Sequence, residues 1–414
     1  MPRPYTISGI DIGNSQVKVV IARVNSDSLK PEIIGSGSAV SNGLRRGVIV
    51  DMEETIENVR SAVQRAEAMA GTKIKRSYLA VNGLHVHSQT SRGVIAVSRA
   101  DNEISQNDID RVIKAASVVS LPPNREIIHV IPKNFIVDGA EYVKNPLGMK
   151  GVRLEADVLI IDGLSPYLRN LIKCVNQNNI EVAGLVYAPI ASSLSVLDKN
   201  QKEYGVVNID FGGGTSSLSV YEEANLLHSI ILPIGSRHIT NDLAVLLRTS
   251  IDVAERIKIE HGSTSNAEDL RKRGELDLSE VIGEKNFVIP KKQIIKVIDA
   301  RTQELFDIVS NELKKVSKTG LLPAGVVLSG GGVNLPGIIM LAKEKLRLPV
   351  RMARSIHFEG MSETVDDPAF SVAMGAVLWG MSGELGEYGG KAAASPDNND
   401  VWGKFMNWLK NFMP

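Results

Sequence analysis

The sequence predicts an α/β protein with two similar halves, and two observations support this. Strands alternate with amphipathic helices in residues 6–84 and again after residue 206, as in layered α/β domains. A β-hairpin with an Asp-x-Gly turn occurs at residues 7–21 and recurs at residues 206–220. Because a repeated unit indicates internal duplication, we expect two related halves, each interrupted by an inserted segment.

The hairpin at residues 7–21 ends its first strand in Asp11 and then turns through Gly13. A glycine-containing turn can present backbone N–H groups to a phosphate, and Lys18 can add a positive charge to it. This hairpin therefore supplies a set of candidate phosphate-binding residues, namely Asp11, Gly13, Asn14, Ser15 and Lys18.

Helices and strands complete the first half, which we assign to residues 1–84 and 164–200. Apolar residues at helical spacing predict a helix between Asp51 and Gly71, and a strand follows at 77–81. The same patterns predict helices at 165–177 and 189–197, with a strand at 182–187 between them.

Residues 85–163 form a predicted α+β insert in the first half. A helix at 105–118 is expected to begin with Ser105 as its N-cap and Asp108 in its first turn. No group of residues in the insert has catalytic spacing, so we interpret it as an interaction module. Strands are expected at 94–97, 127–130, 135–137 and 158–161.

The second half, residues 201–235 and 319–383, begins with the second hairpin. Asp210 matches Asp11 at the end of a strand, and three glycines follow it. The glycines can adopt positive φ without steric cost, which predicts a concave set of N–H groups for phosphate. Asp11 and Asp210 together could hold a hydrated Mg²⁺. The candidates in this hairpin are Asp210, Gly212, Gly213, Gly214 and Thr215.

A mostly helical segment, residues 236–318, interrupts the second half. Glu255 and Lys258 are three residues apart on one predicted helix face, where they could bind ribose hydroxyls and a purine edge. Near the end of this segment, five apolar residues at helical spacing predict one long buried face: Ile294, Ile298, Leu305, Ile308 and Val316.

The chain then returns to the second half with a strand at 324–329, which breaks into three glycines before a helix at 338–346. The glycines, which leave room for a purine and a ribose, are Gly330, Gly331 and Gly332. A last helix at 369–380 contains Ala373, Gly375 and Ala376, which allow close packing against the helix at 189–197. Two such helices crossing between the halves could act as a hinge.

The C-terminal segment predicts a flexible linker at 384–399 and an amphipathic helix at 400–414. Lys404 and Lys410 lie on its polar side. A short helix that is aromatic on one face and basic on the other is typical of attachment to a membrane surface. The apolar face includes Trp402, Phe405, Met406, Trp408, Leu409 and Phe412.

Composition excludes several classes of protein. The chain has 414 residues with 47 basic and 47 acidic side chains, so nothing in its charge favours nucleic acid. The single cysteine, Cys174, excludes a disulfide framework within the chain. We expect no signal peptide before the first strand, and no apolar run approaches the ~18–20 residues of a membrane-spanning helix.

Four motifs occur in one order along the chain: the Asp-x-Gly hairpin, the Asp-Phe-Gly-Gly-Gly-Thr hairpin, the Glu-x-x-Lys helix and the Gly-Gly-Gly-x-x-x-Pro-Gly turn. This set resembles the actin/Hsp70/sugar-kinase superfamily. With the insert, the C-terminal helix and the segments 145–153 and 254–262, the whole chain resembles the FtsA family of bacterial cell-division proteins.

The resemblance implies an actin-like ATPase fold of two RNase H-like halves, with ATP and Mg²⁺ as ligands. It also implies filaments on the cytoplasmic face of the cell membrane at the division site, which anchor FtsZ filaments (the Z ring) and recruit later division proteins through the insert. The family binds the FtsZ C-terminal peptide on the helical subdomain, where we expect the contacts to be Lys291, Lys292, Arg301 and Glu304.

Other members of the superfamily remain as alternatives, namely a pilus-assembly-type scaffold and a small-molecule kinase. The kinase would need a carboxylate base beside an open substrate pocket, and the pilus-assembly relative generally lacks an amphipathic C-terminus. Hsp70-like members place a water-orienting glutamate where this chain has Ala188. We therefore expect at most slow hydrolysis, with ATP acting mainly as a structural ligand.

Overall fold

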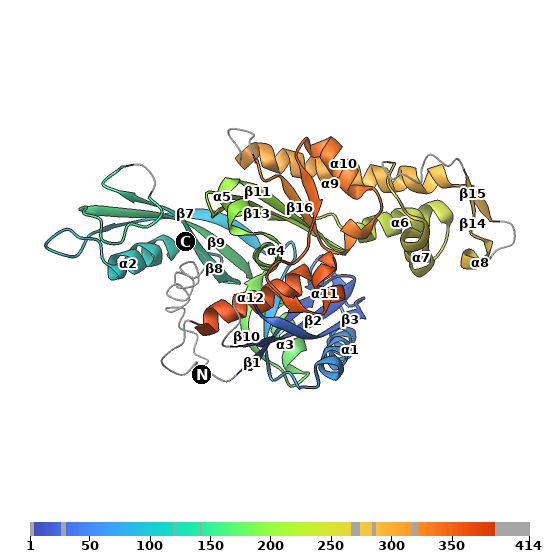
Figure 1. The fold of residues 1–414 in the computed structure, drawn as a ribbon, viewed down its shortest axis with the longest axis horizontal. Coiled ribbons are helices and arrows are strands. Elements are labelled where there is room, and N and C mark those ends of the chain that lie inside the picture. The colour runs from blue at the N-terminus through green and yellow to red at the C-terminus, as the bar shows by residue number, and fades with distance from the viewer. Residues whose placement is uncertain are drawn as a thin grey trace.

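The computed structural model describes residues 4–25, 30–119, 121–140, 143–265, 274–283, 287–316 and 322–385. Two large β-sheets lie at its centre, an inserted subdomain projects from one side and a helical subdomain from the other (Figure 1). Among the described residues, no helix combines the length and apolar character needed to cross a lipid bilayer. The predicted amphipathic helix and the linker from residue 386 onward lie outside this described part.

The two large sheets repeat one strand order. The first sheet runs, in spatial order, β10 (Glu181–Tyr187), β6 (Arg76–Val81), β1 (Tyr5–Ile12), β2 (Gln16–Val24), β3 (Glu32–Val40) and β18 (Glu359–Gly360). The second runs β17 (Val350–Met352), β16 (Val326–Ser329), β11 (Val206–Phe211), β12 (Ser216–Glu222) and β13 (Asn225–Leu232). Apart from β18, which pairs parallel to β3 at the edge of the first sheet, each sheet joins three antiparallel strands to two parallel ones, which is the expected result of a duplication.

The helices of the two halves begin and end close to the predicted positions. Helix α1 is capped by Asp51, whose side chain accepts from the backbone of Glu54, and ends at Gly71 with φ 65°. The main helices are α1 (Met52–Ala70), α3 (Ser165–Asn176), α4 (Ala188–Val196), α10 (Ile338–Leu346) and α12 (Ser371–Leu385). The smaller elements are β4 (Leu44–Arg45), β5 (Val48–Ile49), α5 (Lys199–Tyr204), α11 (Ser362–Asp366) and two 3-10 turns, Gly331–Asn334 and Pro368–Phe370.

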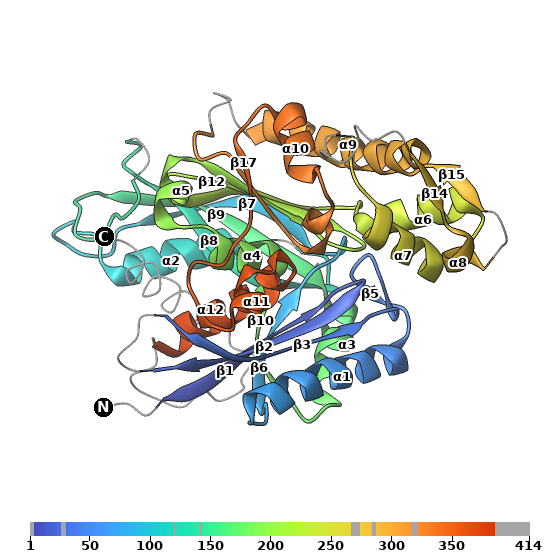
Figure 2. The same cartoon turned by 45° about the vertical axis from the view of Figure 1, so that its right-hand side comes forward.

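Helices α4 and α12 cross between the two sheets, as the small residues of α12 predict (Figure 2). A Cβ atom on Gly375 would lie 1.7 Å from the backbone oxygen of Ala191, so only glycine allows this approach. Helix α12 packs on β1, β2 and β6, whereas α4 also contacts β11 and β12 of the second sheet. The two helices therefore connect the halves directly.

The insert contains β7 (His87–Ala96), α2 (Gln106–Ser117), β8 (Arg125–Val137) and β9 (Arg153–Leu164), with β9 central in its sheet. Ser105 caps α2 and Asp108 lies in its first turn, as predicted, and the two residues also exchange hydrogen bonds. The two strands predicted at 127–130 and 135–137 are wrong in one respect, because they form the single strand β8. Its register shifts between Pro132 and Asn134, since proline cannot donate to the sheet.

The helical subdomain contains α6 (Ser236–Leu247), α7 (Ile251–His261), β14 (Glu275–Asp277), α8 (Ser279–Ile282), β15 (Val288–Pro290) and α9 (Lys291–Val316). Ile294, Ile298 and Leu305 are fully buried on α9, in agreement with the predicted apolar face. The hairpin of β14 and β15 was not predicted, since three-residue strands are too short to show a period.

Candidate nucleotide site

The two hairpins have closely similar turns at the ends of β1 and β11. A Cβ atom on Gly13 would lie 2.7 Å from the carbonyl oxygen of Gln16, and one on Gly212 would lie 2.7 Å from that of Thr215. In both turns the preceding aspartate, Asp11 or Asp210, lies 3.8 Å from the same position. The duplication therefore extends to the backbone geometry of the turns.

The glycines of the second hairpin lack the predicted backbone conformation. None of Gly212, Gly213 and Gly214 has a positive φ, so the expected left-handed turn is wrong. Instead, a Cβ atom on Gly213 would lie 2.0 Å from Ser15 Oγ, and one on Gly214 would lie 2.6 Å from Asn14 Cγ. The glycines are needed because the two hairpins contact each other at their tips.

Arg237, at the start of α6, connects the two hairpin tips and was not predicted from the sequence. Its guanidinium donates to the carbonyl oxygen of Asn14 at 3.1 Å, and its backbone N–H donates to that of Gly213 at 2.8 Å. Gly47 N–H also donates to the side chain of Asn14, at 3.1 Å. No pattern in the sequence indicates a role for Arg237. The close approach of its segment to the second hairpin is visible only in the structure, where an added Cβ atom on the nearby Gly235 would lie 2.2 Å from Gly213 O.

Asp11 and Asp210 form a pair of buried, electrostatically coupled carboxyl groups, 9% and 8% exposed. Burial raises the pKa of Asp11, against the charge of Lys18. Burial, and next the charge of Asp11, raise the pKa of Asp210 to about 6, although Lys18 and a hydrogen bond from Ser329 oppose this. A divalent cation between the two groups would relieve both effects.

Two carboxylates suit a hydrated Mg²⁺, which keeps several water ligands and needs few from the protein. In the described part of the chain, no cluster of three or more His, Cys, Asp or Glu side chains could hold a metal ion. The donor set therefore favours a cation that shares its coordination with water and phosphate over one held entirely by the protein.

Glu255 and Lys258 meet on α7, as their spacing predicts. Lys258 Nζ lies 2.7 Å from Glu255 Oε2 and 2.9 Å from Thr240 Oγ1 on α6. Burial lowers the pKa of Lys258, while Glu255 counteracts the effect, and the charge of Arg237 acts in the same direction as burial. Because Arg237 also contacts Asn14, the pair lies close to the hairpin tips.

Two of the three glycines after β16 are explained by packing. Gly330 has φ 86°, and a Cβ atom on it would lie 2.7 Å from the backbone oxygen of Phe211. A Cβ atom on Gly332 would lie 2.5 Å from the Phe211 ring, whereas one on Gly331 would meet only Ala369, at 3.7 Å. All three glycines were expected to leave room for a purine and a ribose. Of the three, only Gly331 has open space at the position of an added Cβ atom.

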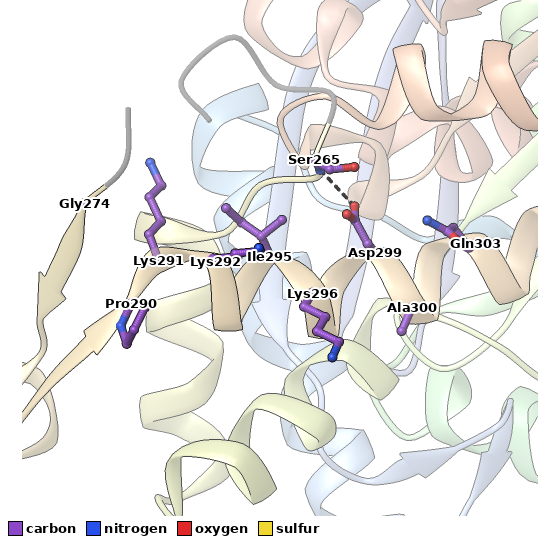
Figure 3. Close-up of a pocket in the computed structure, with 10 residues that line it drawn as sticks. All are labelled: Ser265, Gly274, Pro290, Lys291, Lys292, Ile295, Lys296, Asp299, Ala300 and Gln303. Atoms are coloured by element: carbon purple, nitrogen blue, oxygen red, sulfur yellow. Dashed lines mark hydrogen bonds between the residues drawn. The ribbon is translucent and has the colours of Figure 1, made fainter. Parts of the chain in front are cut away.

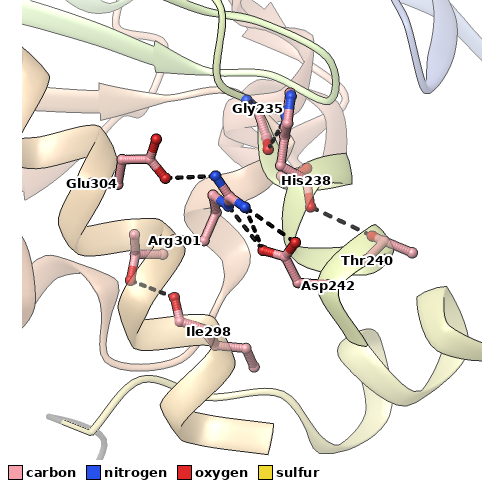
Figure 4. A network of polar contacts seen from close by, with 9 residues as sticks. Gly235, His238, Thr240, Asp242, Ile298, Arg301 and Glu304 are labelled. Atoms are coloured by element: carbon pink, nitrogen blue, oxygen red, sulfur yellow. Dashed lines mark hydrogen bonds and ion pairs between the residues drawn. The ribbon is translucent and has the colours of Figure 1, made fainter. Parts of the chain in front are cut away.

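The charged residues predicted to bind a partner separate into two groups. An open pocket of about 790 Å³ lies at the start of α9, and Lys291, Lys292 and Lys296 line it (Figure 3). Arg301 does not line this pocket; it forms a bidentate pair with Asp242 of α6, at 2.9 and 3.1 Å (Figure 4). Glu304 also binds Arg301, at 2.5 Å. Of the four predicted residues, Lys291 and Lys292 line the pocket, whereas Arg301 and Glu304 do not.

Known proteins share this architecture. The SHS2 domain inserted in FTSA matches residues 83–162, and Cell division protein FtsA matches residues 207–375. The chain is 34% identical to the cell division protein FtsA of Pseudomonas aeruginosa over 91% of this chain and 89% of that protein. It is 37% identical to that of Bacillus subtilis over 89% of this chain and 82% of that protein.

Solved structures show the same fold at low sequence identity. The PilM-PilN type IV pilus biogenesis complex gives a TM-score of 0.63 at 16% identity, covering 90% of this chain and 98% of that chain. MreB 5 of Spiroplasma citri bound to AMPPNP gives 0.54 at 14% identity, covering 93% and 98%. The fold is actin-like, and from the two matching families and the similar relatives the chain belongs to the FtsA family of cell division proteins.

Proposed function

We propose that this chain binds MgATP between its two hairpins and anchors FtsZ filaments to the cytoplasmic face of the cell membrane. The observation that supports nucleotide binding best is the buried pair of Asp11 and Asp210 at the ends of two matching turns. The MreB 5 structure with the same fold contains AMPPNP, which supports a nucleotide in this fold.

Each part of the site has a role in this proposal. Asp11 and Asp210 hold the hydrated Mg²⁺, which neutralises phosphate charge when it is bound. Lys18 and the backbone of the two turns hold the phosphates, together with the hydroxyls of Ser15 and Thr215. Glu255 and Lys258 face the ribose and the purine edge, and Gly331 leaves room for the ring.

Hydrolysis is expected to be slow. Ala188 is the first residue of α4 and is buried, and its methyl group cannot orient an attacking water. Because phosphoryl transfer depends on positioning the nucleophile, the protein holds ATP longer than a member with a carboxylate there. ATP then acts mainly as a ligand that keeps the two halves together.

The family assignment supports the anchoring role over the alternatives. Pilus assembly is supported only by the fold, at 16% identity. In our proposal the chain polymerises, its C-terminal segment binds anionic lipid, and the insert recruits later division proteins. No nucleic acid takes part.

Removing residues 400–414 is expected to abolish binding to liposomes of anionic lipid. The apolar face of this tail inserts only in part, and each of its two lysines adds roughly 1 kcal/mol to binding of anionic lipid. One tail therefore binds reversibly, whereas a filament binds firmly through many tails. Co-sedimentation of FtsZ with liposomes, with and without MgATP, measures anchoring directly. Trp408→Glu is the milder variant, and equal pelleting of the truncated and full chains would exclude the membrane role.

Reversing the charge of Lys292 is expected to weaken binding of the FtsZ C-terminal peptide by about 1–3 kcal/mol if the contact is a charge-assisted hydrogen bond. Lys343→Glu on α10 is the matched control, because it changes the net charge equally outside the pocket. Arg301→Glu is less informative, since it sets a carboxylate against Asp242 and Glu304. Fluorescence anisotropy giving equal affinities for Lys292→Glu and Lys343→Glu would refute the site.

A further inference from the structure

A chain of buried hydroxyl and amide groups runs between α4 and the second sheet. Each member is at most 1% exposed, so water does not compete for its hydrogen bonds. We call this set the hydroxyl network, and it consists of Ser329, Asn208, Ser192, Ser193, Ser219 and Ser229.

The network begins at the candidate cation site. Ser329 Oγ lies 3.1 Å from Asp210 Oδ2, 3.3 Å from Asn208 Oδ1 and 3.5 Å from the carbonyl oxygen of Ile209. A hydroxyl has one proton, so it can donate to only one of these three acceptors at a time. A cation bound to Asp210 draws charge from its carboxylate and makes it a weaker acceptor. Cation binding therefore favours donation from Ser329 to Asn208 Oδ1, which is nearer than the carbonyl oxygen of Ile209.

Asn208 carries the network to the first turn of α4. Its amide donates to Ser192 Oγ at 2.8 Å and approaches Ser193 Oγ at 3.3 Å. Both hydroxyls donate to the carbonyl oxygen of Pro189, at 3.2 and 2.7 Å. A change in the position of Asn208 therefore reaches the start of the helix that connects the halves.

The other end of the network contacts the insert. Ser219 Oγ donates to Pro189 O at 3.2 Å and lies 3.5 Å from Ser229 Oγ. The backbone oxygen of Ser229 accepts from Ser88 of β7 at 2.6 Å. The residue that precedes α4, Tyr187, donates its N–H to His129 Nε2 of β8 at 3.0 Å. Both outer strands of the insert sheet are thus bonded to the neighbourhood of α4.

Helix α12 packs closely on the first sheet. A Cβ atom on Gly9 would lie 2.2 Å from the carbonyl oxygen of Ala373, so backbone touches backbone there. A close-packed contact resists sliding, whereas hydroxyls can change partners without opening a cavity. Movement between the halves is therefore easiest along the hydroxyl network.

We propose that Ser329 and Asn208 are positioning residues that couple the ligand state of Asp210 to α4 and, through it, to the insert. The proposal rests on the nucleotide site proposed above. It gives the insert, to which we assign the recruitment of later division proteins, a physical connection to the nucleotide that does not require the two sites to touch.

Hydrogen–deuterium exchange with and without MgATP tests this coupling. In the wild type, MgATP should slow exchange in both hairpin turns and change it in residues 188–196 and 125–137. Ser329→Ala and Asn208→Leu interrupt the network at different points, and both should keep the protection of the turns with an affinity within about fivefold of wild type. In both variants, the change in exchange that MgATP causes in α4 and β8 should be smaller than in the wild type by at least about half.

Ser216→Ala is the matched control, because it removes a buried hydroxyl of the same sheet that donates to Ile234 O, outside the network. It should behave as the wild type. An unaltered response of α4 and β8 in both network variants would overturn the coupling, as would a wild type that protects its turns without any change in α4. A wild type without protection of the turns would instead contradict the nucleotide site on which the coupling depends.

Discussion

Replacing Asp210 with asparagine is expected to stabilise the nucleotide-free protein and also to abolish its stabilisation by MgATP. Burial and the charge of Asp11 raise the pKa of Asp210 to about 6, so the folded protein disfavours its ionised form. At neutral pH the ionised carboxylate costs on the order of 3 kcal/mol, which an amide avoids. The variant also loses a Mg²⁺ ligand, and a ligand at about 100 times its Kd stabilises by about 2.7 kcal/mol.

The stability difference between wild type and Asp210→Asn should depend on pH with a definite sign. A carboxyl group with a raised pKa stabilises the folded state fully below its unfolded pKa, and this contribution is lost as the pH rises through about 6. The wild type should therefore fall below the variant in stability on going from acid to neutral pH. Their melting temperatures should converge toward about pH 4.

Thermal melting with MgATP, and with ATP and EDTA, measures both effects. Asp108→Asn is a control in which the effect on stability should have the opposite sign. Burial opposes ionisation of Asp108, but hydrogen bonds from Ser105 and Ser98 outweigh burial. They hold the pKa of this carboxyl well below its usual range. Asp108→Asn should therefore lower the melting temperature at neutral pH and keep the full MgATP shift. A MgATP shift that survives in Asp210→Asn would exclude the assigned cation site.

Features with a local pattern could be predicted from the sequence. The repeated Asp-x-Gly turn predicted two related halves, and the two sheets do repeat one strand order. Helical periods predicted α1 and the buried face of α9. The small residues of α12 predicted its packing on α4, because a close helix crossing needs residues without bulk on the contact line.

Features that depend on contacts between distant segments could not be predicted. Ser329 reaches Asp210 across 119 residues, and Arg301 pairs with Asp242 across 59, so no local pattern announces either contact. The positive φ predicted for the glycines at 212–214 is wrong. Side chains at Gly213 and Gly214 would collide with the tip of the other hairpin, which is about 200 residues away in the chain.

Gly375→Ala is expected to destabilise the protein by more than about 3 kcal/mol. Alanine favours a helix over glycine by up to about 1 kcal/mol, so an exposed site would gain stability. Here the new Cβ atom would lie 1.7 Å from Ala191 O and 2.7 Å from Ala191 Cα, which are backbone atoms of α4 that cannot rotate away. The helices must then separate, and both sheets lose packing, because α4 and α12 connect them.

Chemical denaturation of the nucleotide-free protein measures this effect, with Gly331→Ala as the matched control. A Cβ atom on Gly331 would meet only Ala369 Cβ at 3.7 Å, an ordinary contact, so the same change of one methyl group should leave the unfolding midpoint nearly unaltered. A large loss in Gly375→Ala beside an intact Gly331→Ala would show that the crossing of α4 and α12 holds the two halves together. Equal midpoints for the two variants would mean that the halves tolerate separation at this crossing, and that their cohesion comes from elsewhere in the interface.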